Sequence, residues 1–284
     1  FGNPSRLGVP DELEATLFSP KELTPCVACL CVAPTGEVYA GIDQIGSLGK
    51  GAGFGRILRL TDQDNDGVSD GHTVYAEIDN PRGMISVGDK LYVLHTKWAD
   101  EKNFDGMFLS VLEDKNGDGK ADGPPKHLVK EISTRKYNQA RGVDHTTNGI
   151  RMGIDGWIYV AVGDFGFVDA TGTDGTKLTM YGGGIIRVRP DGTELETFAH
   201  GLRNIYDIAI DPYMNVFTRG NTNDGGGWNI RFIHEVQTGQ YGYPTLFKRY
   251  TSEIIPALVD VGGGSGTGAM YFDEPGWPKQ FTGV

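Results

Sequence analysis

The stretch that decides the fold is Ile154-Asp155-Gly156-Trp157-Ile158-Tyr159-Val160-Ala161. It places a glycine turn directly before a strand rich in Val, Ile and Tyr. These residue types favour strands, and alternation with a period of two is typical of a sheet. The same turn-and-strand unit recurs at residues 34–41, 87–94 and 211–218. Because no long stretch has the helical period of 3.6, the sequence excludes a helical protein.

Each of these strands is followed by a second apolar strand, at residues 55–60, 106–112, 184–189 and 228–233. Repeated strand units of this length predict an all-β fold, a six-bladed β-propeller with four strands in each blade. Four blades are readable, and residues 262–272 look like the start of a fifth. A propeller closes on itself to protect its edge strands. We therefore expect a lead-in at 1–24 and an incomplete propeller at 25–284, with the remaining blades missing or in another chain.

Composition narrows the functional class. The chain has 43 glycines in 284 residues, about twice the usual share, which fits many tight turns. Its formal net charge of −11 argues against a nucleic-acid partner, which would need a basic surface. No apolar run approaches the ~18 residues of a membrane span.

The three cysteines, Cys26, Cys29 and Cys31, fall within one short segment. The spacing Cys-x-x-Cys-x-Cys raises the question of a metal site, but no fourth Cys or His follows at zinc spacing. The alternative is structural: Cys29 and Cys31 lie on one face of a strand, and Cys26 is free or paired locally. The structural interpretation is favoured.

Two acidic loops follow the second strands of the first two units. Each has oxygen donors at positions 1, 3, 5 and 9, glycine at position 6, and a carbonyl available at position 7, which is typical of calcium loops. The predicted ligands are Asp62, Asp64, Asp66, Asp70 and the Val68 carbonyl in the first loop, and Asp114, Asn116, Asp118, Asp122 and the Lys120 carbonyl in the second.

Position 12 of these loops holds Thr73 and Pro125 rather than glutamate, so the loops are not full EF-hands. We expect two structural Ca²⁺ ions that stiffen hairpins, and hence a calcium-rich compartment, periplasmic or secreted. The alternative is a pair of solvated Asp/Asn turns.

A candidate active site begins at Asp144-His145, immediately before a predicted strand. Loops held by rigid strands carry much of enzyme chemistry, and a histidine there can act as a proton-abstracting base. The alternative is a histidine that braces the blade through hydrogen bonds. Arg203, in Gly201-Leu202-Arg203-Asn204, opens the next unit on the same expected rim. His95, at a strand end, is a weaker candidate.

The order Asp-His, Gly-x-Asp-Gly-x-Ile-Tyr-Val-x-x-Gly-Asp, Gly-Leu-Arg-Asn and Tyr-Gly-Tyr-Pro resembles the soluble glucose/sorbosone dehydrogenase family. Its members are six-bladed propellers that bind pyrroloquinoline quinone (PQQ) with calcium. The run from Arg203 to Ala209, followed by Asn223-Asp224-Gly225-Gly226-Gly227-Trp228-Asn229, is closer still to the propeller part of large planctomycete and verrucomicrobial dehydrogenases, which a cytochrome-type domain often follows.

The resemblance implies roles for particular residues. His145 matches the base that removes the proton of the sugar C1 hydroxyl, with Asp144 as the carboxylate beside it. Arg203 matches the arginine against the reactive quinone carbonyl, and the backbone at Asn221 and Thr222 matches the carbonyls that hold the cofactor's calcium.

The sequence also departs from the family. Ile205-Tyr206-Asp207 stands where the family has Pro-Gln-Gly, and the glutamine upstream of the base has no clear equivalent near Arg82-Gly83-Met84. The family's later Lys and Arg residues, which clamp the quinone, would lie beyond Val284.

Three functional hypotheses follow. The first is a calcium- and quinone-dependent dehydrogenase that oxidises a sugar or related alcohol and passes electrons to a cytochrome. The second is a non-catalytic, calcium-stiffened propeller that binds a polysaccharide or a partner subunit. The third, a hydrolase or lyase using the same histidine, is weaker because no paired carboxylates or nucleophile motif stand out.

Overall fold

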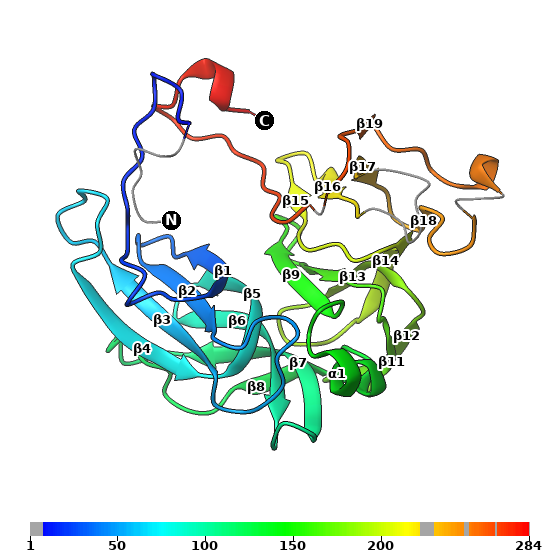
Figure 1. The fold of residues 1–284 in the computed structure, drawn as a ribbon, viewed down its shortest axis with the longest axis horizontal. Coiled ribbons are helices and arrows are strands. Elements are labelled where there is room, and N and C mark those ends of the chain that lie inside the picture. Colours follow the sequence, from blue (N-terminus) through cyan, green and yellow to red (C-terminus); the bar gives the residue numbers. More distant parts are fainter. Residues whose placement is uncertain (1–7, 222–229, 247–249, 265, 284) are drawn as a thin grey trace.

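The computed structural model describes residues 8–221, 230–246, 250–264 and 266–283. Within them, the regular structure is mostly β and forms four sheets that follow one another in an open arc around a central axis (Figure 1). The helical elements of the described residues are α1 (Arg135–Arg141) and two short 3₁₀ turns, Thr251–Glu253 and Lys279–Phe281. The predicted all-β propeller class and its four blades are therefore confirmed.

The first two blades are antiparallel meanders whose second and third strands are the units found in the sequence. The strands of the first are β1 (Val27–Val32), β2 (Val38–Asp43), β3 (Gly55–Thr61) and β4 (Gly71–Glu77). Those of the second are β5 (Asp79–Val87), β6 (Lys90–Trp98), β7 (Phe104–Glu113) and β8 (Lys126–Lys130).

The third and fourth blades repeat this order with additions. The third contains β9 (Thr147–Met152), β10 (Ile158–Val162), β13 (Gly183–Val188), β14 (Glu196–Leu202) and, parallel to β14, β18 (Gly239–Gln240). The fourth contains β15 (Ala209–Ile210), β16 (Val216–Arg219), β17 (Arg231–Glu235) and β19 (Val259–Asp260).

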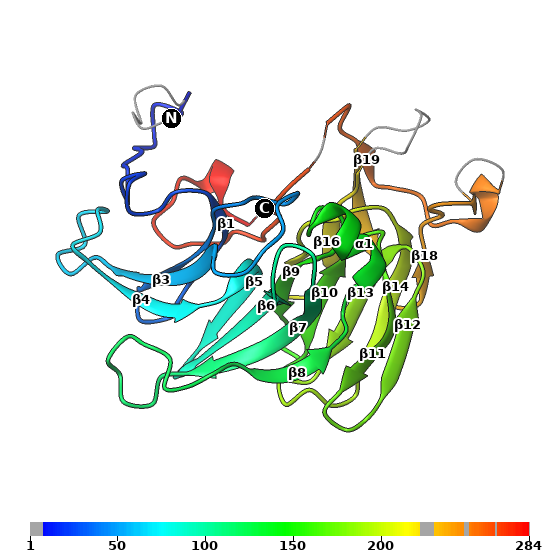
Figure 2. The same ribbon diagram turned by 60° about the horizontal axis from the view of Figure 1, so that its bottom comes forward.

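One hairpin departs from the simple repeat. The connection between β10 and β13 forms β11 (Phe167–Gly172) and β12 (Lys177–Met180), and β11 pairs with β8 of the preceding blade. The hairpin thus extends the outer edge of the second blade rather than the third (Figure 2). Sequence periodicity does not reveal such an exchange because each strand looks the same whichever sheet receives it.

The core lies between successive blades, where separate clusters of buried side chains fill the three junctions. Tyr75 and Leu91 belong to the cluster of the first junction. Leu94 and Val160 belong to that of the second, and Val216 to that of the third. Burial of apolar area between sheets is the main stabilising contribution to such a stack.

The described part of the lead-in packs against the first blade. Phe18 and Leu23 cover a cluster on the open face of that blade, which includes Ile42 and Leu58. The main chain also contacts the first acidic loop, because the Ser69 amide donates to the Phe18 carbonyl over 2.8 Å.

The lead-in repeats the contacts that β4 makes one blade later. Thr16 Oγ1 donates to the Gly67 carbonyl over 3.2 Å, and Thr73 Oγ1 donates to the Gly119 carbonyl over 2.8 Å. Gly67 and Gly119 are the equivalent sixth positions of the two acidic loops. Thr16 therefore makes with the first loop the same hydrogen bond that Thr73 of β4 makes with the second loop.

The segment expected to begin a fifth blade does not form a strand. Beyond Asp260, the described residues up to Gly283 contain no β element, and the chain crosses from the fourth blade toward the lead-in (Figure 1). Arg151 Nη2 donates to the Ala269 carbonyl over 3.3 Å, which attaches this crossing segment to the third blade. In the described part of the chain, no helix has the length and apolar character needed to span a membrane.

Candidate functional site

The rim of the third blade brings His145 and Asp164 together. The ladder between β9 and β10 continues past both strands, with Gly163 N donating to Thr146 O over 2.8 Å and Phe165 N donating to His145 O over 3.1 Å. A side chain at position 163 would lie within 2.4 Å of two carbonyl oxygens, so only glycine fits. Antiparallel pairing thus places Asp164 directly beside the predicted base.

His145 is held by one carboxylate and lies near a second. His145 Nδ1 lies 2.6 Å from Asp164 Oδ1, and His145 Nε2 lies 3.6 Å from Asp144 Oδ2. Because a carboxylate only accepts, the neutral imidazole carries its proton on Nδ1 and leaves the lone pair on Nε2. The ring stacks on Phe165 with 5.5 Å between centroids. The arrangement suits a general base.

The second carboxylate is itself paired. Arg141 Nη2 lies 2.5 Å from Asp144 Oδ2, so this carboxylate is shared between an arginine and the imidazole edge. The His145 side chain is 13% exposed, which is enough to reach solvent at the rim but leaves most of the ring covered.

Asparagine side chains join the Arg203 segment to the His145 segment. Asn204 Nδ2 donates to the Asp144 carbonyl over 3.1 Å, and Asn148 Nδ2 donates to Asn204 Oδ1 over 3.1 Å. Asn221, which is buried, donates from Nδ2 to the Asn204 carbonyl over 3.2 Å. These bonds therefore link the Arg203 segment to the His145 segment and link Asn221 to Asn204, whereas Thr222 lies outside the described residues.

Sequence reasoning missed Asp164, Asn148 and Tyr243. Tyr243 Oη donates to Asp164 Oδ2 over 3.4 Å, so the tyrosine lies on the far side of the same carboxylate. A signal for Asp164 was present: the pair Gly163-Asp164 directly follows β10, which pairs with β9, and His145 lies shortly before β9. His95, in contrast, is buried inside the second blade and bonds to Ser110 Oγ over 2.8 Å, which removes it from the rim.

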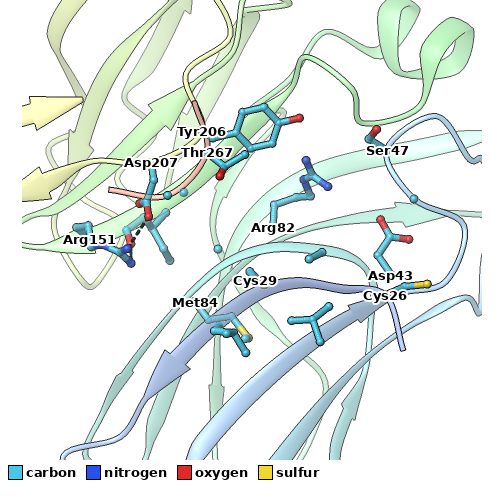
Figure 3. A pocket seen from close by; sticks show the side chains of 18 residues that line it. Cys26, Cys29, Asp43, Ser47, Arg82, Met84, Arg151, Tyr206, Asp207 and Thr267 are labelled. Carbon is cyan, nitrogen blue, oxygen red and sulfur yellow. Dashed lines mark hydrogen bonds and ion pairs between the residues drawn. The ribbon is translucent and has the colours of Figure 1, made fainter. Parts of the chain in front are cut away.

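A cavity of about 680 Å³ lies in the central channel between the innermost strands. Arg82, Asp43, Tyr206 and Thr267 project toward it from different elements (Figure 3). Asp43 accepts from Asn80 Nδ2, and burial raises the pKa of Asp43 while the amide and Arg82 oppose that rise.

The departures from the expected family motif line this cavity. Asp207, on its wall, pairs with Arg151 over 2.5 Å, and Tyr206 lies beside it. Burial raises the pKa of Asp207, and Arg151 opposes this rise. The substituted motif therefore places an ion pair and an aromatic ring inside the channel.

The acidic loops lie where the sequence places them, between β3 and β4 and between β7 and β8. Each folds around its first aspartate: Gly67 N donates to Asp62 Oδ2 and Gly119 N donates to Asp114 Oδ2, both over 2.9 Å. In the first loop, carboxylate oxygens of Asp62, Asp64 and Asp70 lie within 4.8 Å of one another. Asp62 Oδ1 is buried with no hydrogen-bond partner among the described residues, which fits a donor set open to a cation.

The cysteines are free thiols in the first blade. Cys29 and Cys31 lie on the inward face of β1 and pack against the apolar cluster between the first two blades. Burial raises the pKa of both thiols to about 12, which disfavours the thiolate form that acts as a nucleophile or metal ligand. These positions agree with the structural interpretation of the segment.

Solved structures with the same fold include three sugar dehydrogenases. An oxidoreductase of Thermus thermophilus, described as a glucose dehydrogenase, has a TM-score of 0.62 at 18% identity, with 88% of this chain and 74% of that chain covered. The PQQ-bound aldose sugar dehydrogenase of Streptomyces coelicolor has a TM-score of 0.59 at 17% identity, with 88% and 75% covered. The apo-form of the soluble aldose sugar dehydrogenase of Escherichia coli has a TM-score of 0.50 at 13% identity, with 90% and 78% covered.

At such identities the likeness establishes the propeller fold alone, and no curated protein matches the sequence. One family model, described as a domain of unknown function, DUF7133, matches residues 33–254, which is most of the chain. The chain therefore belongs to the DUF7133 family.

Proposed function

We propose that this chain is the propeller of a calcium- and PQQ-dependent dehydrogenase that oxidises a sugar or related alcohol and passes the electrons to a cytochrome. The observation that carries the proposal is the hydrogen bond from His145 Nδ1 to Asp164 Oδ1 at the channel rim. It fixes the tautomer whose Nε2 lone pair can receive a proton. The solved sugar dehydrogenases with this fold, at low identity, support the same reaction class.

On this proposal, the residues at the rim would hold the reactive side of the quinone. His145 presents a basic nitrogen. Arg203 directly follows β14 of the same blade, and the neighbouring Asn204 side chain donates to the Asp144 carbonyl. Bound PQQ would supply the two-electron acceptor. The backbone carbonyl of Asn221 would be a ligand for the calcium of that cofactor, and the family resemblance assigns a second carbonyl to Thr222, which lies outside the described residues.

His145 Nε2 would take the proton of the substrate hydroxyl, and bound PQQ would supply the acceptor for the hydride of the same carbon. The C–O bond becomes a carbonyl, so one proton and one hydride account for the two electrons removed. Asp164 stabilises the imidazolium that forms, and Phe165 covers one face of the ring. Asp144 adds a second negative charge near the protonated edge.

We further propose that the two acidic loops bind structural Ca²⁺, which fits a periplasmic or secreted protein. Support comes from the clustered carboxylates of the first loop and from the matching hydrogen bonds in the second.

A second function is favoured by one specific observation. Both imidazole nitrogens of His145 lie near carboxylates, which is also the geometry of a bracing ion pair. On this alternative the chain is a non-catalytic propeller that binds a polysaccharide or a partner subunit. Loss of stability, without any loss of a measurable reaction, in His145→Gln would support it.

The experiment is an absorption spectrum, a metal analysis and a dye-reduction assay with aldoses after addition of PQQ and Ca²⁺. We expect quinone binding and substrate-dependent dye reduction that His145→Gln abolishes. Absence of both quinone binding and dye reduction would contradict the proposal.

A further inference from the structure

Arg82 is a cation of the central cavity without an ion-pair partner in the described part of the chain. Its neighbour Arg151 is neutralised by Asp207 over 2.5 Å. Arg82, in contrast, donates from Nη2 to the uncharged Asn148 Oδ1 over 3.3 Å, and its guanidinium carbon lies 5.8 Å from the centre of the Tyr206 ring. Arg82 Nε is buried, and none of the described residues accepts a hydrogen bond from it.

Three side chains with hydroxyl groups line the same cavity as this guanidinium. Ser47, Tyr206 and Thr267 line the same cavity, and their side chains come from three different segments (Figure 3). Asp43 forms a further wall and can accept hydrogen bonds from a ligand. An arginine binds a carboxylate with two parallel hydrogen bonds, whereas hydroxyls and a carboxylate suit the hydroxyls of a sugar.

We propose that the cavity binds a small sugar acid, such as a hexuronate, with Arg82 binding its carboxylate. The volume of about 680 Å³ lies within the range of small-molecule sites, about 300–1,000 Å³. The inference that this ligand is the substrate rests on the proposed function, whereas the inference that it binds in the cavity does not.

The cavity is connected to the rim. Val143 N donates to the Ser47 carbonyl over 2.7 Å, two residues before His145. Asn148 contacts both Arg82 and Asn204, and Asn204 holds the Asp144 carbonyl. A ligand anchored at Arg82 is therefore held by the same network that positions the predicted base.

The test is calorimetric titration of the purified chain with glucuronate, glucose and glucose phosphate, without quinone or dye. We expect glucuronate to bind at least about tenfold more tightly than glucose, because a charge-assisted bond adds to the hydroxyl contacts. Arg82→Gln should weaken glucuronate binding by about 10- to 100-fold and should affect glucose binding much less, so that the preference for the acid is lost. Arg82→Lys keeps the charge and should retain part of the preference.

Arg135→Gln is the matched control, since Arg135 pairs with Glu131 on the surface away from the cavity. Thermal unfolding of each variant checks that it is folded. Equal binding of glucuronate and glucose, stronger binding of glucose phosphate, or an unchanged preference in Arg82→Gln would overturn the proposal. Because no turnover is measured, binding can succeed even if the chain proves not to be a dehydrogenase.

Discussion

His145 Nδ1 and Asp164 Oδ1 lie 2.6 Å apart although the two residues are 19 positions apart in the sequence. The contact exists because β9 begins and β10 ends at the same rim, so their antiparallel ladder extends to these two side chains. The carboxylate selects the tautomer and orients the ring. The role of His145 Nε2 as a base therefore depends on Asp164.

The first prediction concerns that carboxylate. Asp164→Asn removes the acceptor that selects the tautomer, and we expect kcat of the dehydrogenase to fall about 1,000-fold, with a much smaller change in KM. Tyr243→Phe is the control, because its hydroxyl lies 3.4 Å from the other carboxylate oxygen and not on the ring side. Similar losses of kcat in the two variants would contradict the assignment of Asp164.

A second prediction concerns calcium. Ca²⁺ at 100 times its Kd should raise the free energy of unfolding by about 2.7 kcal/mol for each occupied loop, and a chelator should reverse the effect. Asp62→Asn should weaken this stabilisation, because Asp62 Oδ1 is the buried oxygen open to the ion. The measurement is thermal unfolding with and without Ca²⁺.

Asp191→Asn provides a control for the calcium prediction, since Asp191 Oδ1 accepts from Thr193 N in a turn outside both loops. The variant should keep the full response to Ca²⁺. If Ca²⁺ does not change the melting temperature of the unaltered chain, the loops are solvated turns rather than calcium sites.

A third prediction uses the equivalence of Thr16 and Thr73. Thr16→Val should speed hydrogen exchange at the Ser69 amide, because it loosens the lead-in from the first loop. Thr73→Val should act instead on the Ala121 amide, which donates to Tyr75 O over 2.9 Å. Each variant is the control for the other. Equal changes at both amides would mean that the lead-in does not take the role of an outer strand.

The fourth prediction is a pH dependence of stability. Burial lowers the pKa of His95 from 6.5 to about 4. In this pH range the unfolded chain binds a proton on His95 that the folded chain does not bind. The free energy of unfolding therefore decreases as the pH falls from about 6.5 to about 4. The loss attributable to His95 is about 3 kcal/mol.

Denaturant unfolding at several pH values, compared between the unaltered chain and His95→Gln, isolates this contribution. The free energies of unfolding of the two proteins should converge as the pH falls from about 6.5 to about 4. A constant difference between them would exclude His95 as the titrating group. His127, half-buried beside it, has a pKa that burial also lowers, and it is present in both proteins.

The repeat of glycine turns and Val/Ile/Tyr strands was enough to predict the blades, because burial between sheets demands that pattern. Gly156 and the strand from Ile158 to Val162 lie where the sequence predicts them. The β11–β12 hairpin could not be predicted, because strand exchange between blades depends on tertiary packing. Neither could the lack of a strand in the described residues after Asp260, where glycine-rich sequence resembles earlier turns.

The candidate site was predicted in part. Asp144, His145 and the Arg203 segment stand out because the residue types carry chemistry. Asp164 becomes significant only once the register of β9 and β10 is known, and Arg82 only once the channel is seen. Single sequence motifs identify residues with reactive side chains, whereas contacts between residues of different strands can be identified only from the three-dimensional structure.

The most direct test of the central claim is a stopped-flow measurement of PQQ reduction. The protein is loaded with PQQ and Ca²⁺, mixed with an aldose or a sugar acid, and followed by the absorbance of the quinone. We expect reduction that depends on the sugar and that slows by about 100- to 10,000-fold in His145→Gln. No reduction in the unaltered protein, or an equal rate in His145→Gln, would contradict the account.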